Sequence, residues 1–340
     1  MLAFCNDYSE GCHPLVLKRL QETNLEELPG YGEDRYTLLA KEKIRKACED
    51  PRAEVTFLTG GTQANQVVIA SLLKSYEGVI CCSSGHIAVH EAGAIEETGH
   101  KVLTIPAVNG KLVAKDLKTF IIDFQSNSSK DHMVQPGMVY LSQSTEYGTL
   151  YSKKELTAIH EVCEAFGLPL FVDGARLGYA LATPENDISL PELARLADVF
   201  YFGGTKFGLL CGEAVVFTRK APEHFMTFVK QHGALVAKGR LLGVQFDALF
   251  TDDLYQQIGK SAIEAANTLR KALKAKGYTF AIDSPTNQTF VVLDNKKMAS
   301  LSKKVWFDVW EKKDSTHTVI RLCTSWATRL EAVKELIKIL

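Results

Sequence analysis

Three polar clusters interrupt the apolar stretches in the middle of the chain, and the first is a glycine-rich turn. Gly60, Gly61, Thr62 and Gln63 lie between an apolar run and a helical pattern. Glycines let the backbone approach a ligand closely, and the free N–H groups at a helix start attract an anion such as a phosphate. The turn lacks the Gly-Lys-Ser/Thr of a P-loop and the spacing of a G-x-G-x-x-G loop. It therefore predicts either a phosphate-binding site or a tight turn without a ligand.

The second cluster begins with an acidic residue, Asp173, which ends the apolar run Leu170–Val172. Open α/β sheets bind their ligands at this end of their strands. Because an unpaired buried carboxylate is costly, Asp173 needs a cationic partner. The sequence leaves two candidates open, which are the nearby Arg176 and the protonated ring nitrogen of a pyridine cofactor.

The third cluster places a lysine, Lys206, between Gly204 and Gly208, directly after the apolar run Phe200–Phe202. Burial of an ammonium group is expensive and lowers its pKa, which makes the amine a good nucleophile for a Schiff base. The alternative is a lysine whose long side chain reaches solvent.

The order of the three clusters is more informative than any one of them. A phosphate-binding turn, an acid at a strand end and a lysine 33 residues later is the order expected of an aspartate-aminotransferase-like, fold type I enzyme that uses pyridoxal 5'-phosphate. In such an enzyme the lysine holds the aldehyde carbon of the cofactor, the acid keeps the ring nitrogen protonated, and the turn holds the phosphate.

Over nearly its whole length the sequence resembles the threonine aldolase and β-eliminating lyase family. The most specific part is Asp173–Arg176 followed by the spaced Lys206, and the turn Gly61–Asn65 comes next. The matching stretches are Asn6–Ser9, Tyr31–Asp34, Gly60–Asn65, His86–Gly93, Val172–Arg176, Gly204–Lys206 and Arg321–Thr324.

The resemblance implies which residues hold the cofactor and the substrate. The residues expected around the cofactor are Gly61, Thr62 and Gln63 at the phosphate, Asp173 at the ring nitrogen, Arg176 near the phenolic oxygen, Lys206 at the aldehyde carbon and His86 stacked on the ring. The residues expected to contact the substrate are Asn6, Tyr8, Tyr31, Arg176 and Arg321.

The resemblance also implies shared active sites in a homodimer or homotetramer. In this family an arginine reaches a cofactor phosphate across a subunit boundary. Arg240 is the best match for it, with Lys238 close by.

The implied reaction is retro-aldol cleavage of L-threonine, L-allo-threonine or a related L-β-hydroxy-α-amino acid to glycine and an aldehyde. Relatives carry Glu-Asn-Thr-His-Asn where this chain has the stretch Gln143–Gly148, so Glu146 replaces a histidine near the substrate hydroxyl. The catalytic residues expected are Lys206, Asp173, His86 and Glu146, and the base could be either of the last two. A phenylserine aldolase or a β-eliminating lyase on the same scaffold is the alternative function.

The segments around these residues alternate between strand patterns and helix patterns. This alternation predicts an α/β fold with a mostly parallel seven-stranded sheet and flanking helices. Several runs are apolar at consecutive positions, as in strands buried on both faces. The expected strands are 54–59, 78–82, 101–106, 138–144, 169–173, 199–203 and 213–218. A helix over 153–166 opens with the capping-box pattern of Ser152 and Glu155.

The pattern changes after about residue 245 to that of a small α+β domain, with a long helix over 253–276 and strands that include 305–310. We therefore expect an N-terminal arm (1–15) that contacts substrate and cofactor, a large cofactor-binding domain (16–245) and a small C-terminal domain (246–340). The polar stretch 123–135 is expected to be a surface loop.

Composition limits the remaining classes of function. The 39 basic and 40 acidic residues are scattered and give a net charge of −1, so neither nucleic acid nor a membrane surface is an expected partner. The eight cysteines contain no C-x-x-C pair, so no metal site is expected. With free thiols, no signal-peptide pattern and no apolar run of about 18 residues, the sequence predicts a cytoplasmic enzyme whose partner is a small amino acid.

Overall fold

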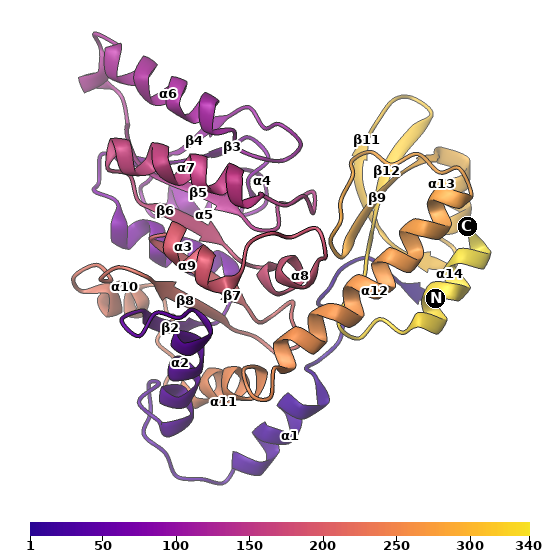
Figure 1. The fold of residues 1–340 in the computed structure, drawn as a ribbon, viewed down its shortest axis with the longest axis horizontal. Helices are drawn as coiled ribbons and strands as arrows, with labels where there is room; N and C mark the ends of the chain where they lie inside the picture. Colours follow the sequence, from indigo (N-terminus) through magenta and orange to yellow (C-terminus); the bar gives the residue numbers. More distant parts are fainter.

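Seven strands form the central sheet of the computed structural model, which describes residues 1–340 (Figure 1). The strand order is β2-β8-β7-β6-β5-β3-β4. Strands β7, β6, β5, β3 and β4 are parallel, whereas β8 is antiparallel to both of its neighbours. The bounds are β2 Glu54–Leu58, β3 Glu77–Cys82, β4 Val102–Ile105, β5 Gln135–Ser142, β6 Leu170–Asp173, β7 Val199–Gly203 and β8 Glu213–Phe217. The predicted mostly parallel, seven-stranded sheet is confirmed.

Helices cover both faces of this sheet, which is why its central strands are apolar at consecutive positions. Every residue of β6, β7 and β8 is buried. One face packs against α3 (Gly61–Leu72), α5 (Ala94–Glu97) and α10 (Phe225–Gln231). The other face packs against α2 (Arg35–Ala47), α6 (Ala114–Ser126), α7 (Lys153–Phe166), α8 (Leu177–Ala182), α9 (Leu190–Leu196) and α11 (Arg240–Leu249).

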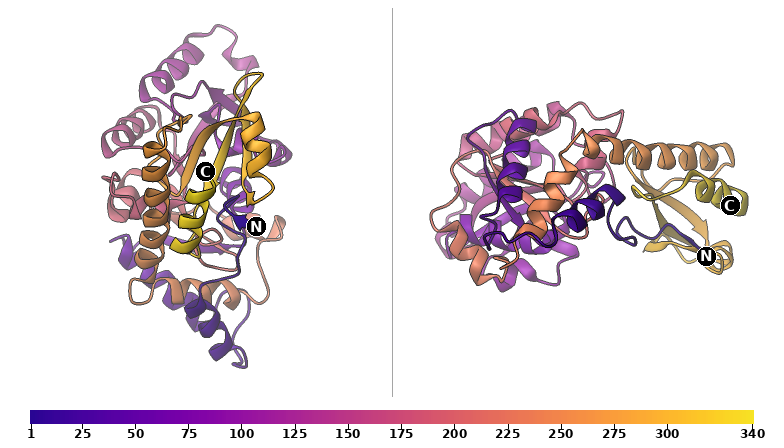
Figure 2. Two further views of the ribbon diagram at one scale, coloured as in Figure 1. Left: turned by 90° about the vertical axis from the view of Figure 1, so that its right-hand side faces the viewer. Right: turned by 90° about the horizontal axis from the view of Figure 1, so that it is seen from below.

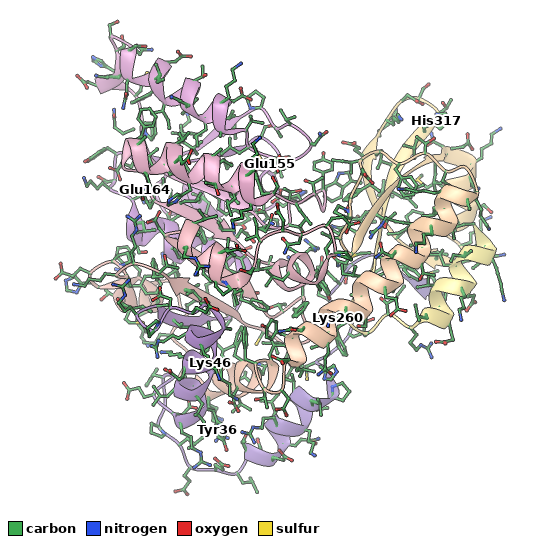
Figure 3. All side chains as sticks on the ribbon, in the orientation of Figure 1. Tyr36, Lys46, Glu155, Glu164, Lys260 and His317 are labelled. Atoms are coloured by element: carbon green, nitrogen blue, oxygen red, sulfur yellow. The ribbon has the colours of Figure 1, made fainter.

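Helix α7 shows how local sequence sets these elements. The Ser152 side chain accepts the backbone N–H of Glu155, and the Glu155 carboxylate accepts the N–H of Ser152, which completes the predicted capping box. Leu156, Ile159 and Cys163 share one buried face of the helix. Glu155 and Glu164, near opposite ends of the helix, are labelled in Figure 3.

The prediction of a loop over residues 123–135 was wrong in its first part. Helix α6 continues to Ser126, and a single 3-10 turn follows at Lys130–His132. The polar composition suggested a loop, but Leu117 and Ile121 are buried one helical turn apart and extend the apolar face of the helix.

The small domain contains a three-stranded antiparallel sheet in the order β11-β12-β9. Its strands are β9 (Gln288–Asp294), β11 (Asp308–Lys312) and β12 (His317–Cys323), and its helices are α13 (Asn295–Leu301) and α14 (Leu330–Ile339). The strand expected over residues 305–310 is two strands with different partners. Strand β10 (Val305–Trp306) pairs with β1 (Leu2–Ala3), whereas β11 pairs with β12. Both termini therefore lie in this domain (Figure 1).

The long helix α12 (Leu254–Ala275) links the two domains (Figure 2). Ile258 and Ala262 pack in the main core, whereas Leu269 packs in the core of the small domain. Gly259 allows α12 to approach α8, because a Cβ at this position would meet the Ala182 Cβ at 2.5 Å.

The remaining helices of the fold are α1 (Pro14–Thr23) and the short α4 (His86–Val89). Helix α11 runs without a break through residue 245, where a domain boundary was expected, and the predicted bounds of the arm, the large domain and the small domain stay predictions. No helix is both long enough and apolar enough to cross a membrane.

Candidate active site

The three predicted clusters meet around one cavity of about 300 Å³, at the carboxyl ends of the parallel strands. Gly60, Gly61 and Thr62 line it from the start of α3, where no side chain caps the helix. Asp173 lines it from the end of β6, and Lys206 lines it from the segment that follows β7. Residues that are more than 140 positions apart in the sequence thus face one space.

Asp173 is buried and has no basic side chain as a hydrogen-bond partner. Its Oδ2 accepts the Tyr140 hydroxyl at 2.6 Å and the Asn65 amide at 3.1 Å, and its Oδ1 accepts the Ala175 N–H at 2.9 Å. Burial raises the pKa of Asp173, but the charge of His86 and hydrogen bonds from Tyr140, Tyr201 and Ala175 outweigh burial and lower it. The carboxylate is therefore held ionised inside the cavity.

Arg176 does not pair with Asp173, so the first of the two partners that the sequence suggested for that acid is wrong. The Arg176 guanidinium instead donates from Nε and Nη2 to both carboxylate oxygens of Asp7, at 2.7 and 2.9 Å. Asn287 donates to the same carboxylate at 2.9 Å. Burial lowers the pKa of Arg176, but the charge of Asp7 and its hydrogen bonds raise that pKa by a larger amount. The guanidinium therefore stays charged beside the cavity.

His86 begins α4 and is connected to Asp173 through a buried network. Its Nδ1 lies 2.6 Å from Glu91 Oε1, and Asn65 donates to that oxygen at 2.7 Å as well as to Asp173. Glu91 Oε2 and Asn65 Oδ1 are buried without a partner. Burial lowers the pKa of His86, but the Glu91 hydrogen bond and the Asp173 charge raise it overall. The side chains of His86, Glu91 and Asp173 each offer one atom that could bind a metal ion, and these three atoms lie within 4.8 Å of one another.

Glu146 lines the cavity close to His86. Its Oε1 accepts the backbone N–H of His86 at 2.9 Å and the Ser142 hydroxyl at 2.7 Å, whereas its Oε2 makes no hydrogen bond. Burial raises the pKa of this carboxyl, and the hydrogen bond from Ser142 offsets part of that rise.

Lys206 is partly buried, and its amine faces several charges. Burial lowers the pKa of Lys206, the charge of Arg176 lowers it further, and the carboxylates of Asp7, Asp173 and Glu213 oppose both effects. A lysine with a lowered pKa supplies the neutral amine that Schiff-base chemistry requires.

Several predicted residues do not line the cavity. The Gln63 side chain stabilises the turn through three hydrogen bonds. Its Oε1 accepts from the N–H and the hydroxyl of Thr59, at 3.1 and 2.6 Å, and its Nε2 donates to the His232 carbonyl at 3.2 Å. Asn6 accepts from Tyr8 N–H at 2.9 Å, and only Tyr8 of this pair lines the cavity.

Arg321 lies in β12, outside the lining. It pairs with Asp308 at 2.9 Å, donates to Gln288 Oε1 at 3.0 Å and stacks over the Trp310 ring. Its Nε is buried without a partner.

The remaining three predicted residues lie at another surface. Tyr31 is half exposed, and its N–H donates to the Ala237 carbonyl at 3.0 Å. Arg240 donates to the carbonyls of Glu26 and Thr23, and Lys238 is exposed. None of them lines the cavity of its own chain.

Sequence reasoning missed four functional candidates of the cavity and its walls. Tyr140 and Tyr201 lie in apolar strands, so the sequence pattern indicates ordinary aromatic residues of the core. Glu91 lies within a matching stretch, but its spacing from His86 gave no sign of their contact. Glu213 opens an otherwise apolar strand, and that isolated acid was the only available signal.

The cavity fits pyridoxal phosphate at each of its polar ends. The uncapped start of α3 offers free N–H groups to a phosphate, and a Cβ on Gly60 would project into empty space. The ionised Asp173 has no ion-pair partner and suits a protonated ring nitrogen. Lys206 supplies the amine in the same cavity.

Comparison with known proteins gives the family. The model of the Beta-eliminating lyase family matches residues 12–296. The low specificity L-threonine aldolase of Pseudomonas aeruginosa is 32% identical over 340 residues, covering 98% of this chain and 95% of that protein. The chain belongs to the beta-eliminating lyase family.

Solved structures agree with this assignment. A Leishmania major threonine aldolase superposes with a TM-score of 0.96 and 40% sequence identity, covering 100% of this chain and 98% of that one. An aspartate aminotransferase of Thermus thermophilus, 12% identical with a TM-score of 0.69, covers 100% of this chain and 90% of its own and shares the fold alone. This beta-eliminating lyase family member is a fold type I, pyridoxal-phosphate-dependent lyase.

Proposed function

We propose that this lyase cleaves L-threonine, L-allo-threonine or a related L-β-hydroxy-α-amino acid to glycine and an aldehyde. The observation that carries the proposal is the meeting of Lys206, Asp173 and the start of α3 in one cavity. The relatives that cover the chain almost completely are described as threonine aldolases.

Lys206 bonds the cofactor in this proposal, and Asp173 keeps its ring nitrogen protonated. Gly61 and Thr62 hold the phosphate with the N–H groups of α3, while Gln63 holds the turn in place. When bound, pyridoxal phosphate withdraws the electrons left on Cα as the Cα–Cβ bond breaks. His86 would stack on the ring of the bound cofactor, and Glu91 fixes its Nδ1, which leaves Nε2 free to donate a hydrogen bond.

Glu146 is the base that the geometry favours. Its Oε1 is engaged by His86 N–H and Ser142, so the free Oε2 is the atom available to the β-hydroxyl of the substrate. Burial raises the pKa of Glu146, which makes its carboxylate a stronger proton acceptor. The hydroxyl O–H bond breaks, the proton moves to Oε2, and His86, with its raised pKa, serves as a hydrogen-bond donor.

The substrate carboxylate is assigned to the two arginines. Arg176 lines the cavity, and its pairing with Asp7 holds the guanidinium in place. Arg321 lies outside the lining of the cavity, and its buried Nε has no hydrogen-bond partner, so the contact proposed for it rests on the family resemblance. Tyr8 lines the cavity and completes the proposed substrate contacts of this chain. The contacts predicted for Asn6 and Tyr31, which do not line the cavity of their own chain, stay predictions.

Assembly and location are part of the proposal. Because Arg240 and Lys238 do not line the cavity of their own chain, their contact with a phosphate requires a second copy, as in a homodimer or homotetramer. The eight cysteines are all free, which favours a reducing cytoplasm.

A product assay tests the function. L-threonine, L-allo-threonine, D-threonine and phenylserine are each incubated with the holoenzyme, and glycine and aldehyde are quantified. We expect glycine from the L-substrates and none from D-threonine. Preference for phenylserine indicates the phenylserine aldolase alternative, and a keto acid with ammonia in place of glycine indicates β-elimination and overturns the proposal.

A further inference from the structure

A tight turn between β5 and α7 carries Glu146, the base of the proposed reaction. The Gly148 N–H donates to the Thr145 carbonyl at 2.8 Å and closes the turn. Glu146 and Tyr147 occupy its two central positions. The Thr149 carbonyl accepts the Thr145 N–H at 3.0 Å, and the hydroxyls of these two threonines lie 2.7 Å apart. Because these bonds make the turn a compact unit, the groups that hold it from outside also set the position of Glu146.

Two hydroxyl groups of the small domain hold the turn at the Gly148 carbonyl. Ser284 donates to that oxygen at 3.1 Å and Thr286 donates to it at 3.0 Å, and both side chains are buried. The approach is so close that a Cβ on Gly148 would collide with both hydroxyl oxygens. A carbonyl oxygen has two lone pairs, so its capacity to accept hydrogen bonds is filled by the small domain.

The segment that carries these hydroxyls is itself fixed to the long helix α12. Arg270 of that helix is buried and donates to the carbonyls of Pro285 and Thr286. It also donates to Asn267 Oδ1 at 2.7 Å, which orients the guanidinium. The Gly148 carbonyl is therefore tied to the helix that links the two domains.

The Tyr147 ring makes a second contact between the turn and the small domain. It lies 5.5 Å from the Trp310 ring, edge to face, and 5.7 Å from the Phe290 ring. Phe290 is buried, and its ring meets Trp310 edge to face at 5.0 Å. On the other side of the turn, Glu146 Oε1 accepts the His86 N–H at 2.9 Å. The turn thus joins the small domain to the cavity.

We propose that Ser284 and Thr286 position Glu146 for the reaction by holding the Gly148 carbonyl. The inference rests on the proposed function, in which Glu146 is the base. Neither hydroxyl lines the cavity or contacts the Glu146 carboxylate, so both residues are positioning residues. Removing the two hydroxyls should leave the cofactor site intact and displace the base.

The first test compares the double variant Ser284→Ala/Thr286→Val with Thr289→Val in the holoenzyme. The control removes a hydroxyl of the adjoining strand β9 that is also buried and has no hydrogen-bond partner. We expect the double variant to lower kcat of glycine release by roughly tenfold with little change in KM, and the control to keep the wild-type rate. Thr286→Ser, which keeps the hydroxyl, should retain most of the rate. Ser284→Ala alone should lower kcat by about threefold, which keeps the test decisive if the double variant does not fold.

Adding Glu146→Gln to the double variant separates positioning from a general loss of stability. Residues that act through one another have effects that do not add. If the hydroxyls act through Glu146, their removal should change kcat by less than about twofold once that residue is glutamine. An equal loss of kcat in both backgrounds overturns the proposal.

Amide hydrogen exchange at His86 needs no substrate and therefore stands apart from the proposed function. The His86 N–H donates to Glu146 Oε1, so its protection reports the position of the carboxylate. Fragmentation mass spectrometry of the holoenzyme should find exchange about tenfold faster in the double variant than in the wild type or Thr289→Val. Unchanged protection in a folded double variant overturns the proposal. Faster exchange, with no glycine formed by the wild type, supports the positioning of Glu146 and assigns the failure to the proposed function.

Discussion

Replacing Asp7 by asparagine removes one charge from the buried Asp7–Arg176 ion pair beside the cavity. The Asp7 side chain is fully buried, and the Arg176 side chain is 11% exposed. Their two hydrogen bonds, at 2.7 and 2.9 Å, form a bidentate pair. Removing one partner of a buried pair leaves an uncompensated charge and typically costs about 3–5 kcal/mol. We expect a loss near 3 kcal/mol for Asp7→Asn, because the asparagine oxygen still accepts one hydrogen bond.

The effect depends on pH in a defined direction. Burial raises the pKa of Asp7, but Arg176 lowers it below the usual 3.8. A lowered pKa in the folded state contributes stability that is complete above the unfolded-state value and is lost as the pH falls through the folded-state value. The variant and wild type should therefore differ fully at neutral pH and converge at pH values well below 4.

Urea unfolding of the cofactor-free protein at several pH values measures this prediction, with Asp308→Asn as a matched control. Asp308 pairs with Arg321 at 2.9 Å, but its side chain is 40% exposed, so its loss should cost under about 1 kcal/mol. Equal urea midpoints for Asp7→Asn and wild type at neutral pH would refute the role given to the pair. So would a difference that grows as the pH falls.

Three further predictions concern the reaction and the assembly. Asp173→Asn should retain part of the cofactor but lose roughly 10- to 150-fold in turnover, since it removes a charge-assisted bond of about 1.5–3 kcal/mol, at about 1.4 kcal/mol for each tenfold change; near-normal turnover contradicts the assignment. Glu146→Gln should slow cleavage and alter the ratio of L-allo-threonine to L-threonine turnover, and an unchanged ratio with an unchanged pH–rate profile returns the base role to His86 or water. Arg240→Ala should bind pyridoxal phosphate more weakly than the wild type, as measured by equilibrium dialysis. Sedimentation of the wild type should find a dimer or tetramer, and a fully active monomer at assay concentration excludes a shared site.

Features that depend on a few neighbouring residues could be predicted from the sequence. Consecutive apolar residues in Leu170–Val172 predicted a strand buried on both faces, and Ser152 with Glu155 predicted the start of α7. The turn at Gly61, the acid at the end of β6 and the lysine after β7 could be placed together because parallel strands bring their carboxyl ends to one edge. The family resemblance then supplied the cofactor.

Features that depend on tertiary contact could not be predicted. Asp7 and Arg176 are 169 positions apart, and no local pattern pairs them. The sequence instead offered Arg176 as a partner for Asp173, to which the real donors are Tyr140, Asn65 and a backbone N–H. A tyrosine in an apolar strand looks the same whether its hydroxyl meets an acid or solvent.

The central claim is that Lys206 holds the cofactor, and chemical trapping tests it most directly. The holoenzyme is reduced with borohydride, digested, and mapped by mass spectrometry for the peptide that carries the pyridoxyl group. We predict the label on Lys206 and no label in Lys206→Ala, which should also release no glycine. A label on any other lysine of the wild-type chain would contradict the account.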